Sequence, residues 1–104
     1  MTRHELNLIL KTEGAGATLR RGEAVQYDAG YQVAVAGKTA TTAESAEKIM
    51  HKYRNNCGLW TSEGICYIDK SFHIKSRRLA FLIGKIFHQQ SVYNWATGEC
   101  EEVK

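Results

Sequence analysis

Apolar residues near the start of the chain follow the three- and four-residue spacing of a short helix, on a face formed by Leu6, Ile9 and Leu10. Thr2 and Glu5 have the spacing of a capping box, in which each side chain satisfies a backbone amide at the helix start. A glycine-rich run follows and ends the pattern. The sequence therefore predicts a short, capped helix at this end.

The hydrophobic period then changes to two, as in strands that bury one face. Short strands are predicted over residues 17–19, 24–27 and 31–36, with tight turns between them. Gly37 and Lys38 are expected to close this meander.

A second amphipathic helix is expected after Thr41, which stands three residues before Glu44 and repeats the capping-box spacing. Its apolar face is formed by Ala43, Ala46, Ile49, Met50 and Tyr53. Residues 55–58 end this helix, so we expect Cys57 to lie at an exposed helix end.

Two further hairpins are predicted, one pairing residues 59–61 with 65–69 and one pairing 91–95 with 100–103. Residues 72–74 are expected to continue the sheet irregularly. Turn residues separate the two arms of each hairpin, which favours antiparallel pairing.

The longest helix is expected over about residues 77–89, with Ser76 as its N-cap. A wide apolar stripe on this helix is predicted to face the core; it contains Leu79, Ala80, Leu82, Ile83, Ile86 and Phe87. Gly84 lies within the helix, where its missing side chain favours close packing on the sheet.

The chain has 104 residues, and domains most often contain about 100–150. The predicted order is α-βββ-α-ββ-α-ββ, with about three helices and with the strands mostly in hairpins. We therefore expect a single α+β domain over residues 1–104, with a largely antiparallel sheet. A composition of 43% hydrophobic and 24% charged residues excludes a disordered tail and a collagen-like fibre.

Fourteen basic and eleven acidic residues give a formal charge of +3, but the charge is unevenly distributed. Residues 48–88 contain eight basic and two acidic side chains, whereas both flanking segments are slightly acidic. A basic segment of this kind favours an acidic or phosphate-bearing partner. Its simpler interpretation is a solvated surface on two helices.

Motifs for catalysis and metal binding are missing from the pattern, so we expect no enzyme, no cofactor and no metal site. No pair of nucleophile and base stands out, and the four histidines lack the spacing of zinc ligands. Three cysteines without a C-x-x-C pair indicate a reducing compartment, with Cys66 as a buried core thiol. No apolar stretch approaches the roughly 20 residues of a membrane span, so we expect a cytoplasmic protein.

The strongest candidate for a binding surface is basic and lies on the face of the longest helix opposite the apolar stripe. Arg77, Arg78 and Phe81 begin this face, and an aromatic ring among cations can stack on a base or anchor a protein. The full predicted surface adds the end of the second helix and contains Lys48, Lys52, Arg54, Lys70, Lys75, Arg77, Arg78, Phe81, Lys85 and His88. In the alternative interpretation, Phe81 is partly buried at the helix edge and the cations only solubilise the chain.

A second candidate is aromatic. Trp60, Tyr93 and Trp95 all fall on predicted hairpin strands, where such residues most often belong to the core. At an exposed strand edge they would serve as interface anchors or pair with a second copy of the chain.

Four segments, GYQVA at 30–34, GLW at 58–60, YIDKS at 67–71 and QSVYNW at 90–95, carry a resemblance to a known group of proteins. The chain resembles the small proteins of bacteriophages and mobile elements, some of which are anti-CRISPR or other anti-defence inhibitors. This resemblance covers the last two thirds of the chain and contains no catalytic motif. It implies a stand-alone binding protein that blocks a larger host machine.

These observations predict a small, non-enzymatic inhibitor or regulator of phage or mobile-element origin, in the cytoplasm of a bacterial host. Its partner would be a larger host protein or nucleoprotein complex, such as a CRISPR-type defence or nucleic-acid-processing machine, blocked by steric occlusion. The alternative is a nucleic-acid-binding module that uses the basic face of helix 77–89. Monomer and homodimer both remain open.

Overall fold

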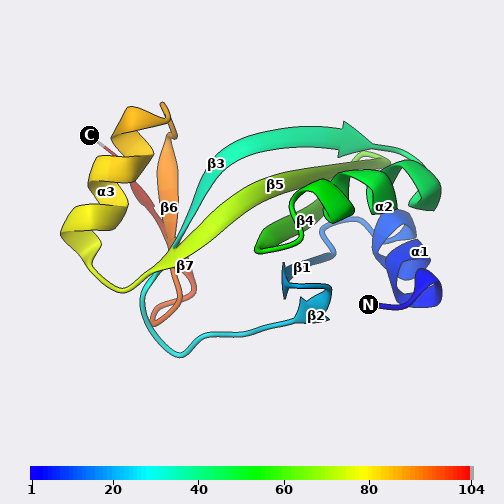
Figure 1. Ribbon diagram of the computed structural model, residues 1–104, viewed down its shortest axis with the longest axis horizontal. Helices are drawn as coiled ribbons and strands as arrows, with labels where there is room; N and C mark the ends of the chain where they lie inside the picture. Colours follow the sequence, from blue (N-terminus) through cyan, green and yellow to red (C-terminus); the bar gives the residue numbers. More distant parts are fainter. Residues whose placement is uncertain (104) are drawn as a thin grey trace. The chain divides into compact units, whose positions relative to one another are not determined.

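The computed structural model describes residues 1–103 and has an α+β fold with the predicted order of elements (Figure 1). The elements are α1 (Arg3–Lys11), β1 (Gly16–Arg20), β2 (Glu23–Ala24), β3 (Tyr31–Ala40), α2 (Ala43–Lys52), β4 (Cys57–Ser62), β5 (Ile65–Ile74), α3 (Arg77–Ile86), β6 (Ser91–Asn94) and β7 (Glu99–Glu102). Hydrogen-bonded neighbours in the sheet follow the order β2-β1-β4-β5-β3-β6-β7. The expected antiparallel α+β architecture is confirmed.

Residue contacts group the described chain into two compact units, which are considered separately below. The first unit contains residues 1–25 and 37–70, and the second contains residues 26–36 and the chain from residue 71 onward. Strands β3 and β5 are each divided between the two units.

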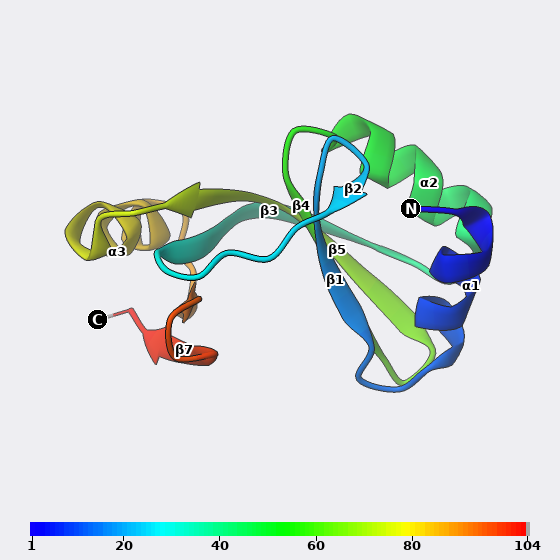
Figure 2. The ribbon, with the colours of Figure 1, turned by 90° about the horizontal axis from the view of Figure 1, so that it is seen from below.

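In the first unit, α1 and α2 cover one face of strands β1, β4 and β5 (Figure 2). Leu6 of α1 and Ala46 of α2 are buried against Leu19, Leu59 and Ile68 of the sheet. The capping box predicted at the start of α1 is present, because the Thr2 hydroxyl accepts from the Glu5 amide and the Glu5 carboxylate accepts from the Thr2 amide. This cap fixes the point at which α1 begins.

In the second unit, α3 packs against β3 and β6 through its smallest residues. Ala80 is fully buried with Val33 and Val92. A Cβ added at Gly84 would lie 3.2 Å from a methyl group of Val92 and 3.2 Å from one of Val103. The predicted close packing at Gly84 is therefore confirmed.

Two predicted boundaries before α2 are wrong. Gly37 and Lys38 do not end the meander, because β3 continues through them to Ala40 beside β5. The N-cap of α2 is Thr42 rather than Thr41, and its hydroxyl accepts from the Ser45 amide at 3.2 Å. Pairing with a neighbouring strand extends β3 beyond its local turn signal, and the helix then begins one residue later.

The end of α3 also differs from the prediction, since the helix stops at Ile86 and not at Gln89. The His88 amide donates to the Lys85 carbonyl at 3.2 Å, and the Gln89 amide donates to the Gly84 carbonyl at 2.8 Å. These are the two bonds of a Schellman motif, with His88 in the left-handed conformation at φ 56°. This motif closes the helix without a glycine, so no stop signal is present in the sequence at this position.

Candidate functional site

The apolar stripe predicted to face the core lies mostly in solvent, and this correction defines the candidate site. Leu82 is 54% exposed and Ile86 is 60% exposed, and Leu79 on the same side is also exposed. Ala80 and Gly84 face the sheet instead. Because these small residues let the helix backbone approach the strands closely, the larger apolar residues turn outward.

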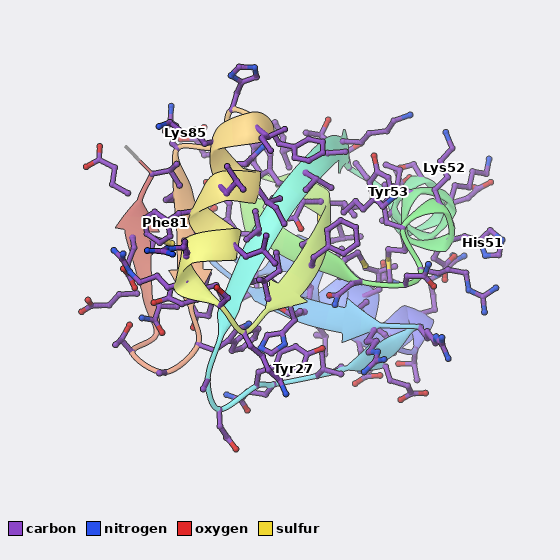
Figure 3. The ribbon with its side chains drawn as sticks, turned by 60° about the vertical axis from the view of Figure 1, so that its left-hand side comes forward. Tyr27, His51, Lys52, Tyr53, Phe81 and Lys85 are labelled. Atoms are coloured by element: carbon purple, nitrogen blue, oxygen red, sulfur yellow. The ribbon has the colours of Figure 1, made fainter. Side chains whose placement is uncertain are left out.

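A shallow groove of about 460 Å³ runs beside this exposed row on α3. Its lining consists of Ser76, Arg78, Leu79, Phe81, Leu82 and Lys85. The side chains of Phe81 and Lys85 are labelled in Figure 3, where both project from α3. We call the groove together with Ile86 the α3 surface; it combines exposed apolar side chains with two cations.

The cations of the α3 surface are available to a partner. Within residues 1–103, neither Arg78 nor Lys85 forms an ion pair, and both are exposed. No acidic residue is among those that line the groove. The α3 surface is therefore electropositive as well as apolar.

Arg77 and Phe81, both predicted as exposed contacts, are engaged within the second unit. The Arg77 Nε donates to a Glu101 carboxylate oxygen at 3.2 Å, and its guanidinium lies 4.2 Å from the centre of the Phe81 ring. The Phe81 ring is half-buried and meets Tyr31 edge-on at 6.1 Å. The pKa of Glu101 is lowered, first by the hydrogen bond from Asn94 and then by Arg77.

The remaining predicted residues divide between the two units. Lys75 and His88 are exposed in the second unit, on either side of α3. In the first unit, Lys48, Lys52, Arg54 and Lys70 are all exposed. Lys48 forms an exposed ion pair with Glu44 at 3.8 Å along α2. A single surface joining both sets stays a prediction.

Sequence reasoning included Arg54 in the predicted surface but missed that Arg20 and Arg21 lie near it in the first unit. The Arg21 amide donates to the Arg54 carbonyl at 2.6 Å, which brings the turn after β1 to the segment that follows α2. Arg20 ends β1 next to this bond, and all three arginines are exposed. A contact between segments more than 30 residues apart leaves no local signal in the chain.

Two aromatic predictions have different outcomes. Trp60, expected in the core, is 53% exposed and contacts the Tyr67 ring at 5.7 Å. Trp95, also expected in the core, is only half-buried, and its indole N–H donates to the Gln32 side chain at 3.0 Å. Its ring also meets Tyr27 edge-on at 5.4 Å.

Tyr27, labelled in Figure 3, lies in this part of the second unit. Its ring stacks on His73 with the ring centres 3.8 Å apart. The His73 Nε2 lies 2.8 Å from the Ala29 carbonyl oxygen. Together with Trp95, these rings hold the segment between β2 and β3 against the second unit's strands. We assign this ring cluster a structural role.

The sequence predicts the burial of two cysteines, and the prediction is confirmed for one and wrong for the other. Cys66 is buried in β5, as expected. Cys57 is buried at the start of β4 and not exposed at a helix end, because the strand begins directly after the helix-terminating turn. Burial, and then the nearby Asp69 carboxylate, raise the pKa of the Cys57 thiol to about 11. Such a thiol is a poor nucleophile at neutral pH.

Comparison of the chain with protein-family models, with curated proteins and with solved structures found no match. Within residues 1–103, no three His, Cys, Asp or Glu side chains come together as a group able to hold a metal ion. The helices in this part of the chain are too short or too polar to cross a membrane.

Proposed function

We propose that the protein is a non-enzymatic binding protein that blocks a larger bacterial protein or nucleoprotein complex by covering part of its surface. The α3 surface would make this contact. The observation that supports the proposal most is the exposed row of Leu79, Leu82 and Ile86 beside two cations without ion pairs. Apolar side chains grouped in this way mark interaction surfaces in small soluble domains.

The chemistry of the α3 surface favours one kind of partner. Leu79 and Leu82 provide the apolar floor of a groove, and Arg78 and Lys85 place positive charge beside it. A complementary segment would carry a row of apolar residues flanked by Asp or Glu, as an amphipathic helix does. We therefore infer that the target presents an acidic, amphipathic segment.

Nucleic acid is the less favoured partner for this surface. Within the groove, base stacking would need an exposed aromatic ring, and Phe81 is half-buried under Arg77; Phe87 at the C-cap of α3 is 47% exposed but does not line the groove. Arg77 itself is paired with Glu101. Phosphate contacts also gain nothing from exposed leucines, whereas a protein partner would cover them. The resemblance to phage-borne proteins directs the search to bacterial defence and nucleic-acid-processing machines.

The proposal is tested by capture from bacterial lysate with tagged protein, with and without nuclease. The informative variant is Leu82→Lys, which places a charge in the apolar row. The matched control is Leu8→Lys, because Leu8 on α1 is 53% exposed, almost the same as Leu82. The wild-type protein and the Leu8 variant should retain the same bacterial protein after nuclease treatment, and the Leu82 variant should lose it.

The partner's chemistry is then tested by charge reversal. Arg78→Glu should weaken binding of the captured protein, and substitution of acidic residues in its bound segment should weaken it equally. Capture that collapses with nuclease and is also weakened by Arg78→Glu would replace the proposal with the nucleic-acid alternative. Capture that is unchanged in the Leu82 variant would show that α3 is not the binding surface.

A further inference from the structure

The sheet of the first unit has an open face that differs in chemistry from the α3 surface. Helices α1 and α2 cover the face that carries Leu19, Leu59 and Ile68. Because side chains alternate along a strand, the residues between these positions point away from the helices. The open face carries Gly16, Thr18 and Arg20 from β1, Gly58, Trp60 and Ser62 from β4, and Ile65, Tyr67 and Asp69 from β5.

Two aromatic rings lie at one end of this open face. Trp60 and Tyr67 are register partners on β4 and β5, and they are 53% and 44% exposed. Their ring centres are 5.7 Å apart with the planes tilted by 32°. One aliphatic residue, Ile65, lies two positions from Tyr67 on the same face, and the other neighbours of the rings are glycine, serine, threonine and aspartate. Exposed rings in polar surroundings are typical of surfaces on which planar groups stack.

A small, mainly apolar hollow of about 270 Å³ adjoins Tyr67. It is lined by Gly37, Lys38, Thr39, Tyr67, Ile68 and Asp69. Gly37 leaves room here, since a Cβ at this position would have a single neighbour, at 3.5 Å. The Thr39 hydroxyl can donate a hydrogen bond on this face, and the Asp69 carboxylate, which accepts from the Gly58 amide at 3.2 Å, is an acceptor. A hydroxyl and a carboxylate next to the two tilted rings can bond to the edge of a nucleobase.

Arg20 lies at the other end of the same face, and the backbones of two further arginines lie beside it. Arg20 is four residues along β1 from Gly16, the register partner of Trp60, which is a distance of roughly 13 Å. Arg21 and Arg54 adjoin it through their backbone hydrogen bond. Within residues 1–103, none of these three arginines forms an ion pair, although Glu23 faces Arg20 across the β1–β2 hairpin. Three guanidinium groups against one carboxylate leave this end positive.

We propose that the open face of the first unit binds single-stranded nucleic acid. Bases would stack on Trp60 and Tyr67, and the phosphates would follow the strand direction to Arg20 and Arg21. A protein partner is less favoured, because the face lacks the contiguous aliphatic side chains that a dry interface needs. This proposal concerns a different unit from the α3 surface, so either one can fail without the other.

The test is fluorescence anisotropy with labelled twelve-nucleotide oligothymidine, oligouridine and a duplex of the same length, at two salt concentrations. Comparison of oligothymidine with oligouridine shows whether the face binds single-stranded DNA, single-stranded RNA or both. Binding of one or both single strands, in preference to the duplex, is expected. Indole fluorescence should be quenched on binding, because Trp60 stacks on a base.

Substitutions separate the two halves of the proposed site. Trp60→Thr should raise the Kd by about 5- to 150-fold, which corresponds to the loss of one stacked base, whereas Trp60→Phe should keep most of the affinity. Arg21→Ser should make the salt dependence shallower by about 0.7 in the slope of log K against log salt. Phe72→Thr is the matched control, since Phe72 is a β5 aromatic exposed to 43% but belongs to the second unit.

Unfolding midpoints of each variant establish that the fold is intact before affinities are compared. The proposal is overturned if neither single strand binds at low salt, or if the duplex binds equally well. It is also overturned if Trp60→Thr binds like the wild-type protein, or if Phe72→Thr weakens binding as strongly as Trp60→Thr does. Capture of a protein through this face in place of an oligonucleotide would likewise contradict it.

Discussion

The orientation of α3 can be tested by placing the same charged side chain at two positions of that helix. Leu82 and Ala80 both belong to the apolar stripe that the sequence predicts to face the core. In the structure Leu82 is 54% exposed, and Ala80 is 0% exposed. The variants Leu82→Lys and Ala80→Lys should therefore differ sharply in stability.

The magnitudes follow from these exposed fractions. Full burial of a leucine side chain contributes about 1.5–3 kcal/mol, so the covered half of Leu82 contributes about 1 kcal/mol. Lysine is a good helix former, and its methylene stem covers part of the same surface. Leu82→Lys should thus cost about 1 kcal/mol or less. Ala80→Lys forces a longer, charged side chain between α3 and the sheet, which should cost about 3 kcal/mol or more.

Urea unfolding followed by far-ultraviolet circular dichroism measures both free energies of unfolding. In thermal unfolding, a loss of 1 kcal/mol corresponds to a fall in Tm of about 4–8 °C for a domain of this size class. A cost above about 3 kcal/mol for Leu82→Lys would show that this side chain is buried. A neutral Ala80→Lys would show that the helix packs through another face, and either result would refute the orientation on which the α3 surface rests.

Three further predictions concern the thiols, the ring cluster and acid stability. Cys57 should be alkylated far more slowly than the exposed Cys100 at pH 8, because its pKa is raised to about 11; peptide mass spectrometry measures both rates. Gly30→Ala should destabilise the protein by about 2 kcal/mol or more in urea unfolding, because Gly30 has φ 90° and its Cβ would lie 2.5 Å from the His73 ring. The pKa of Glu101 is lowered in the folded state, so just below the ordinary glutamate pKa the folded state binds fewer protons than the unfolded state. The free energy of unfolding should therefore fall as the pH falls through this range. The fall should be less steep in Glu101→Gln.

Each of these predictions has a result that would contradict it. Equal alkylation rates at the two cysteines would mean that the start of β4 is open to solvent. Gly98→Ala is the control for the ring cluster, because Gly98 also has a positive φ of 73° but its Cβ would meet no atom closer than 3.8 Å. If Gly30→Ala lowered the free energy of unfolding no more than Gly98→Ala does, the predicted clash with His73 would be contradicted. An unchanged acid profile in the Glu101 variant would show that its hydrogen bonds to Asn94 and Arg77 do not persist in solution.

Local signals in the sequence predicted the elements and several of their ends. Ser76 caps α3 through the Leu79 amide, and the Thr2–Glu5 pair caps α1, because both motifs lie within one helical turn. Tertiary contacts decided the rest. β3 extends past Gly37 because β5 is its neighbour, and this pairing is not encoded within the strand itself.

The candidate sites were harder to predict than the fold. Hydrophobic spacing shows that α3 has an apolar side, but it does not reveal that Ala80 and Gly84 pack more closely on the sheet than the leucines would. Trp60 is exposed because α1 and α2 cover the other face of β4, which depends on strand order. The proximity of Arg21 to Arg54 depends on a backbone hydrogen bond between distant segments.

Site-specific photo-crosslinking tests the central claim, that the α3 surface contacts a protein partner, most directly. Leu82 is replaced by benzoylphenylalanine in one sample and the equally exposed Leu8 in another, and both are irradiated in bacterial lysate after nuclease treatment. The account predicts one crosslinked bacterial protein from position 82, joined through an acidic, apolar segment, and none from position 8. No adduct at position 82, a self-adduct of the chain, or the same adduct from both positions would contradict it.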